Sequence, residues 1–134
     1  MGDRDQKDFS EYVDAWRTRL ARREGERRIR VRQLREVARA CARRLVWDFG
    51  AREVYLFGSL LDEELAHERS DIDLAVAGLE GRLYFKALSS VWELLPAGVE
   101  LDLVPLEQAK PGLAERVKAE GVLLEFLHTL ERGA

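Results

Sequence analysis

The stretch that decides the fold consists of two short apolar segments separated by a polar insert: Val54-Tyr55-Leu56-Phe57-Gly58-Ser59 and Ser70-Asp71-Ile72-Asp73-Leu74-Ala75-Val76. The first segment is rich in β-forming residues and stops at Gly58-Ser59, which predicts a buried strand followed by a helix. In the second segment apolar and acidic residues alternate. Ile72, Leu74 and Val76 should therefore face a core, while Asp71 and Asp73 share the other face.

A third acidic position follows on a similar segment, Val99-Glu100-Leu101-Asp102-Leu103-Val104. Its apolar residues alternate inward, so Asp102 and Glu100 point outward and compete for the same role. Neighbouring carboxylates repel each other unless a cation lies between them. Three of them, next to a Gly-Ser turn that lets phosphate approach backbone N–H groups, predict a site for divalent cations and a nucleoside triphosphate.

Together, Gly58-Ser59, Asp71-Ile72-Asp73 and Asp102-Leu103-Val104 resemble the motifs of the nucleotidyltransferases of the DNA polymerase β superfamily. The resemblance is strongest to the minimal nucleotidyltransferase (MNT) group and covers roughly residues 54–124. It implies an α/β fold of the polymerase β-like nucleotidyltransferase type, with a small mixed sheet backed by helices. We accordingly predict an N-terminal helical extension over residues 1–50 and a nucleotidyltransferase core over residues 51–134.

The resemblance also implies a reaction and a set of site residues. A nucleoside monophosphate, with ATP favoured over another NTP as its source, is transferred to a hydroxyl by two-metal catalysis. Asp71 and Asp73 are implied to ligate both Mg²⁺ ions, and Asp102 the ion that activates the acceptor. Gly58 and Ser59 are implied to hold the β- and γ-phosphates.

The acceptor stays open at this level. Small MNT proteins are often antitoxins paired with a HEPN-type toxin, which makes a partner protein the favoured acceptor. A small-molecule, aminoglycoside-like nucleotidyltransferase is the enzymatic alternative. Family members often carry an Arg-Gly pair shortly after the Gly-Ser, where this chain has Leu60-Leu61. A catalytically degenerate antitoxin that acts by binding alone is therefore a third possibility.

Residues 5–49 have the periodicity of helix, interrupted only by Gly25, which allows two helices or one long bent helix. Apolar residues recur at steps of three and four positions: Phe9, Tyr12, Val13, Trp16 and Leu20, then Leu34, Val37, Cys41 and Leu45. The aromatic part of this stripe exceeds what a small catalytic core needs. We expect it to dock on a partner protein or on a second copy of the chain.

Charge is distributed unevenly, with a net charge of +5 in residues 1–50 and −8 in residues 51–134. The arginines of the first half, Arg22, Arg23, Arg27, Arg28, Arg30 and Arg32, are interleaved with glutamates and are most simply a solvated helix face. A nucleic-acid surface is possible but not favoured, because the aromatic residues of this segment do not lie among the arginines.

Further helices are expected over residues 59–66, 83–95 and 113–120, while residues 122–127 fit a strand or a helix equally well. Cys41 is the only cysteine, so an intrachain disulfide is impossible and a reducing compartment is indicated. Neither a signal-like segment nor a run of transmembrane length is present in the sequence. We expect a cytoplasmic protein with no membrane partner.

Overall fold

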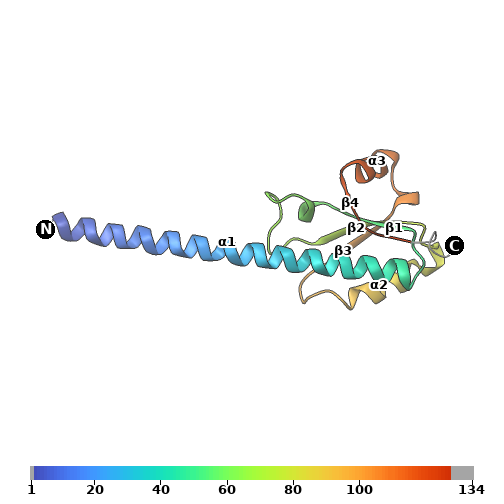
Figure 1. The fold of residues 1–134 in the computed structure, drawn as a ribbon, viewed down its shortest axis with the longest axis horizontal. Helices are drawn as coiled ribbons and strands as arrows, with labels where there is room; N and C mark the ends of the chain where they lie inside the picture. Colours follow the sequence, from blue (N-terminus) through green and yellow to red (C-terminus); the bar gives the residue numbers. More distant parts are fainter. Residues whose placement is uncertain (1, 128–134) are drawn as a thin grey trace, which may run out of the picture.

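The computed structural model describes residues 2–127, with side chains from residue 8 (Figure 1). Its four-stranded sheet has the order β3-β2-β1-β4. The strands are β1 (Glu53–Phe57), β2 (Ile72–Ala77), β3 (Leu101–Pro105) and β4 (Val122–Phe126). In Figure 1 the sheet lies between α3 on one side and the helices α1 and α2 on the other. The predicted α/β fold with a mixed sheet and an N-terminal helical extension is confirmed.

The sheet is mixed because β2 pairs with β1 antiparallel and with β3 parallel. Alternation along β2 assigns its side chains to two faces: Ile72, Leu74 and Val76 belong to the core shared with α1 and α2. Ala75 and Ala77 belong to a smaller apolar cluster that includes Val117 of α3. Asp73 falls on this second face, in the second position of β2, and is half-buried.

Residues Gly2–Trp47 form one helix, α1, so of the two alternatives left open by the sequence the structure has the single helix. Gly25 does not end the helix, and Glu24 makes ion pairs across it with Arg27 and Arg28. These contacts at spacings of three and four residues stabilise the helix at the position where glycine weakens it. The helix stops before Gly50, whose φ of 78° favours glycine.

The second half of α1 is part of the main core. Its buried residues are Val31, Leu34, Ala38, Cys41, Ala42, Leu45 and Val46. The boundary predicted at residue 50, between the helical extension and the nucleotidyltransferase core, lies just after the end of α1. Because the second half of α1 packs on the sheet, this half of the helix and the sheet share one hydrophobic core. Of the nucleotidyltransferase core predicted over residues 51–134, residues 128–134 lie outside the described residues.

Two arginines of α1 hold the segment after β1. Arg27 donates from Nη1 to the Ala66 carbonyl oxygen at 2.6 Å, and Arg35 donates from Nε to the Leu60 carbonyl oxygen at 2.8 Å. Arg35 also pairs with Glu63 at 2.8 Å. Arg27 was predicted to be part of a solvated face, but its guanidinium instead fixes a loop to the helix.

The helix predicted over residues 59–66 is wrong. A single 3₁₀ turn, η1 (Ser59–Leu61), is followed by turns. Asp62 has extended backbone angles, and its carboxylate accepts a hydrogen bond from the Glu64 N–H at 2.8 Å. This local side-chain bond competes with helix formation, which explains why the helix does not continue.

The other elements lie close to their predicted positions. A 3₁₀ turn, η2 (Gly81–Leu83), leads into α2 (Tyr84–Trp92); η3 (Leu106–Gln108) follows β3; and α3 spans Pro111–Glu120. The undecided segment after α3 is the edge strand β4. Within the described chain, no helix combines the length and apolar character needed to cross a membrane.

Candidate functional site

Asp73 and Asp102 are register partners on the parallel strands β2 and β3. Residues paired in this way project their side chains to the same face of a sheet. Phe57, the last residue of β1, is the partner of Asp73 on the other side. One row across three strands therefore places two acidic side chains next to each other, with an aromatic residue beside them.

Asp71 lies just before β2 and is exposed. One of its carboxylate oxygens accepts a hydrogen bond from the Glu100 N–H at 3.3 Å, and the Ile72 N–H bonds to the Glu100 carbonyl oxygen at 3.0 Å. Asp71 thus joins the beginnings of β2 and β3. Glu100, the competing carboxylate, is exposed at the same entrance.

The electrostatics of the row are unfavourable for an ionised Asp73. Burial raises the pKa of Asp73, and the charges of Asp102 and then Asp71 raise it further. No ion pair found among the described side chains involves any of these three aspartates. In the same part of the chain, no group of three or more His, Cys, Asp and Glu side chains is close enough to hold a metal ion as it stands. The three carboxylates are electrostatic neighbours, and their oxygens do not form a ready-made ligand set.

Gly58 directly follows β1 and is in contact with Asp73. Its φ of 81° and ψ of −158° are accessible essentially to glycine alone. A Cβ atom placed there would overlap the Asp73 Oδ2 atom and lie 3.2 Å from the Asp73 Cβ. The turn therefore brings the backbone of Gly58 against one carboxylate of the row.

Ser59 is held by the insert that separates the two motifs. Its hydroxyl donates to the Ser70 Oγ at 3.1 Å, and the same Ser70 oxygen accepts from the His67 N–H at 3.0 Å. Ser70 is buried. The Gly58-Ser59 turn is thus tied to the residue that precedes Asp71. The short helix expected after Ser59 is replaced by one 3₁₀ turn, so no α-helix dipole supports this position.

A hollow of about 800 Å³ opens between this turn and α3. Gly58 and Ser59 form one wall, and Leu113, Arg116, Val117 and Glu120 of α3 form another. Arg116 is exposed and makes no ion pair with a described side chain. Sequence reasoning missed this residue, because it lies 57 positions after Ser59 and the antiparallel pairing of β4 with β1 is what brings α3 back to the turn.

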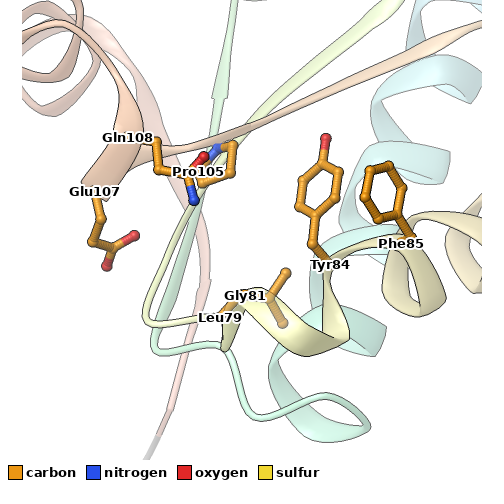
Figure 2. A pocket seen from close by; sticks show the side chains of 7 residues that line it. All are labelled: Leu79, Gly81, Tyr84, Phe85, Pro105, Glu107 and Gln108. Carbon is orange, nitrogen blue, oxygen red and sulfur yellow. The ribbon is translucent and has the colours of Figure 1, made fainter.

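A second hollow, of about 590 Å³, lies at the opposite end of β2 and β3, lined by residues that include Leu79, Tyr84, Phe85, Pro105 and Glu107 (Figure 2). The Tyr84 hydroxyl donates to the Leu103 carbonyl oxygen at 2.6 Å. Burial, and then the charge of Asp102, raise the pKa of Tyr84. This hollow includes none of the predicted site residues, so we assign the candidate site to the hollow beside Gly58.

A comparison with protein families identifies the class of protein to which this fold and its row of acidic residues belong. Residues 48–125 match the polymerase beta nucleotidyltransferase family. The matched part includes β1, β2, β3 and all of β4 except its last residue, together with Gly58-Ser59 and the three aspartates. The chain belongs to this nucleotidyltransferase family, as the sequence motifs predicted.

Solved structures agree with this assignment. The chain is similar to a toxin–antitoxin structure with AMP-PNP, at 25% identity and a TM-score of 0.53, over 70% of this chain and 77% of that one. It is also similar in fold to a mutant MntA-HpeT toxin–antitoxin structure, at 23% identity and a TM-score of 0.52, over the same shares of the two chains. No curated protein sequence matches the chain.

Proposed function

We propose that this protein is a nucleotidyltransferase of the MNT type that transfers AMP from ATP to a hydroxyl of a partner protein, of the HEPN toxin class. The observation that carries the proposal is the pairing of Asp73 with Asp102 beside Gly58. Two carboxylates on adjacent strands, one of them in contact with the glycine turn that lines the hollow, are suited to hold a metal-bound triphosphate.

The residues present fit a divalent cation. Carboxylate oxygens are the ligands that Mg²⁺ prefers, and among the described side chains neither the two aspartates of the row nor Asp71 is paired with a basic group. Asp71, Asp73 and Asp102 would hold two Mg²⁺ ions once their side chains turn toward a common point. When bound, the ions would neutralise phosphate charge and help to deprotonate the acceptor hydroxyl.

The remaining residues would bind and orient the triphosphate. Gly58 leaves its backbone open to close approach by an anion. The Ser59 hydroxyl can turn from Ser70 to donate to a phosphate oxygen. Arg116 would supply the positive charge that other family members place in an Arg-Gly pair after the Gly-Ser. The hollow also contains Asp62, Glu63 and Glu120, so it is not basic by itself and favours a metal-bound triphosphate over a free one.

The proposed step is a single displacement at phosphorus. The acceptor oxygen forms a bond to the α-phosphorus as the bond to the β-phosphate oxygen breaks. Pyrophosphate leaves, and the hydroxyl proton is released. The protein contributes position and charge to this step and forms no covalent bond of its own.

A partner protein is the acceptor that the comparisons favour. The structure at 25% identity is a toxin–antitoxin complex with AMP-PNP, an analogue of ATP. Its similarity supports both an adenine nucleotide and a protein partner for this chain. The same fold could also serve a small-molecule nucleotidyltransferase or an antitoxin that acts by binding alone. These alternatives differ in outcome, because the first would label a small molecule and the second would transfer nothing.

Labelled ATP separates these functions. With Mg²⁺ and a HEPN-type partner, ATP labelled at the α-phosphate should transfer its label to the partner, whereas ATP labelled at the γ-phosphate should not. The Asp73→Asn variant should transfer neither label. Label found on a small-molecule acceptor but never on protein would redirect the proposal to the aminoglycoside-like class. Partner binding without any transfer would leave the binding-only antitoxin.

A further inference from the structure

The first part of α1 extends away from the sheet, and no other described helix or strand lies beside it (Figure 1). We call residues 8–23 the arm. The arm has an apolar stripe, defined as Phe9, Tyr12, Val13, Trp16 and Leu20. The exposed fractions of its aromatic side chains are high: 70% for Phe9, 66% for Tyr12 and 51% for Trp16. A contiguous exposed apolar surface of this kind marks an interaction site.

The stripe is continuous with the buried face of the same helix. Steps of seven, four and three residues lead from Leu20 through Arg27 to Val31 and Leu34, which keeps all of them on one side of an α-helix. Val31 and Leu34 are buried against the sheet. The sheet therefore covers one half of a single apolar face, and the arm presents the other half uncovered.

We propose that the arm docks antiparallel on the arm of a second copy of this chain. In the symmetric arrangement Phe9 of one copy lies opposite Leu20 of the other, and Val13 lies opposite Trp16. Phe9 and Trp16 then each meet a smaller aliphatic residue, which is how facing helices fill space evenly, and Tyr12 lies opposite Arg17. A parallel arrangement would instead oppose Trp16 to Trp16 and Val13 to Val13.

Charge selects the same direction. Residues 8–14 contain three acidic residues and no basic one, whereas residues 17–23 contain four arginines and no acidic residue. Antiparallel docking places the acidic segment of each copy beside the basic segment of the other. Parallel docking would place like charges side by side. The helix dipole favours acidic residues only in the first turn, so it does not account for four arginines in the middle of α1.

This inference is independent of the proposed reaction, because no residue of the sheet or of the site takes part. It assigns the stripe to self-association and leaves the site face free for another protein. The arm would thus join two catalytic units at a fixed separation, with the sheets at the two ends of the paired helices.

Two neighbouring substitutions test the docking face. Trp16→Glu puts a charge in the stripe, and Ala15→Glu puts the same charge one position away, about 100° around the helix. Both positions are exposed, and glutamate favours helix in both. Sedimentation equilibrium of the full chain should show a concentration-dependent dimer for the wild type and for Ala15→Glu, and a monomer for Trp16→Glu. Far-UV circular dichroism at low concentration confirms that both variants fold.

A spin label tests the direction of docking. Glu26 is exposed beyond the stripe, and the native Cys41 is fully buried, with burial raising the pKa of its thiol to about 11, so Glu26→Cys should be labelled alone. Antiparallel arms would separate the two labels by about 35 Å at 1.5 Å per residue, whereas parallel arms would bring them to about 10 Å. A wild-type protein that stays monomeric at high micromolar concentration, a Trp16→Glu variant that dimerises like the wild type, or the short label distance would each overturn the proposal.

Discussion

The carboxylate of Asp73 occupies the space that a side chain at position 58 would need, so Gly58 and Asp73 behave as one structural unit. The contact joins the end of β1 to the start of β2, which are register neighbours through Phe57 and Asp73. It gives Gly58 a role that the sequence did not reveal. The glycine permits the close approach of the acidic row to the turn, in addition to the expected approach of phosphate.

Replacing Gly58 with alanine should therefore damage both the fold and the site. The backbone angles of Gly58 cost a side-chain-bearing residue about 1–3 kcal/mol. The new methyl group would also push Asp73 away from the turn. We expect thermal unfolding to show a loss of stability larger than this backbone cost, together with a loss of nucleotide binding.

The Asp73→Ala background separates the two effects. There the carboxylate is absent, so Gly58→Ala should cost only the backbone part. An equal loss of stability in both backgrounds would show that the contact with Asp73 contributes nothing to the requirement for glycine.

Asp73→Asn should stabilise the metal-free protein. Burial and the neighbouring charges of Asp102 and Asp71 raise the pKa of Asp73 above its ordinary value of 3.8. A carboxyl whose pKa is raised on folding stabilises the folded state below its unfolded pKa, and that contribution is lost as the pH rises through the folded pKa. At neutral pH the ionised Asp73 therefore lowers the free energy of unfolding.

Denaturant unfolding in the presence of EDTA measures this effect. The stability advantage of Asp73→Asn over the wild type should be smallest at low pH, grow as the pH rises through the folded pKa of Asp73, and level off above it. Ala15→Gln, an exposed and uncharged change outside the apolar stripe, is the control and should show no such pH dependence. A variant that is less stable than the wild type at neutral pH would contradict the repulsion inferred for the row.

Arg116→Ala should weaken the binding of ATP more than that of AMP. The side chain lines the hollow beside Gly58 and Ser59, where the β- and γ-phosphates are proposed to lie. Loss of one charge-assisted hydrogen bond is worth about 1.5–3 kcal/mol, or about tenfold to a hundredfold in affinity. Lys118→Ala, two residues further along α3 and outside the hollow, is the matched control. Equal effects of the two variants would mean that Arg116 acts only through net charge.

The sequence predicted the strands of this protein well because their signals are local. The strand β1 begins one residue before the first apolar segment of the sequence and ends with it at Phe57, and β2 and β3 each begin two residues after the start of their predicted segments. Alternation along β2 correctly separated Asp73 from Ile72 and Leu74. The family motifs also lie on strands or directly beside them, and these motifs predicted the family that the comparison then confirmed.

The features that the sequence did not predict depend on contacts between distant residues. The segment after Ser59 has helical composition, yet Asp62 and the anchoring arginines Arg27 and Arg35 hold it as a loop. Arg116 reaches the site only because β4 pairs with β1. Neither arrangement has a signature within a short window of sequence.

Calorimetric titration with a non-hydrolysable ATP analogue tests the central claim most directly. The claim is that Asp73 and Asp102 hold a metal-bound triphosphate beside Gly58. The analogue should bind the wild type with Mg²⁺ and fail to bind in EDTA, and Asp73→Asn and Asp102→Asn should each abolish the Mg²⁺-dependent binding. Ala15→Glu, on the distant arm, should bind like the wild type. Equal binding with Mg²⁺ and with EDTA, or binding unchanged in both aspartate variants, would contradict the account.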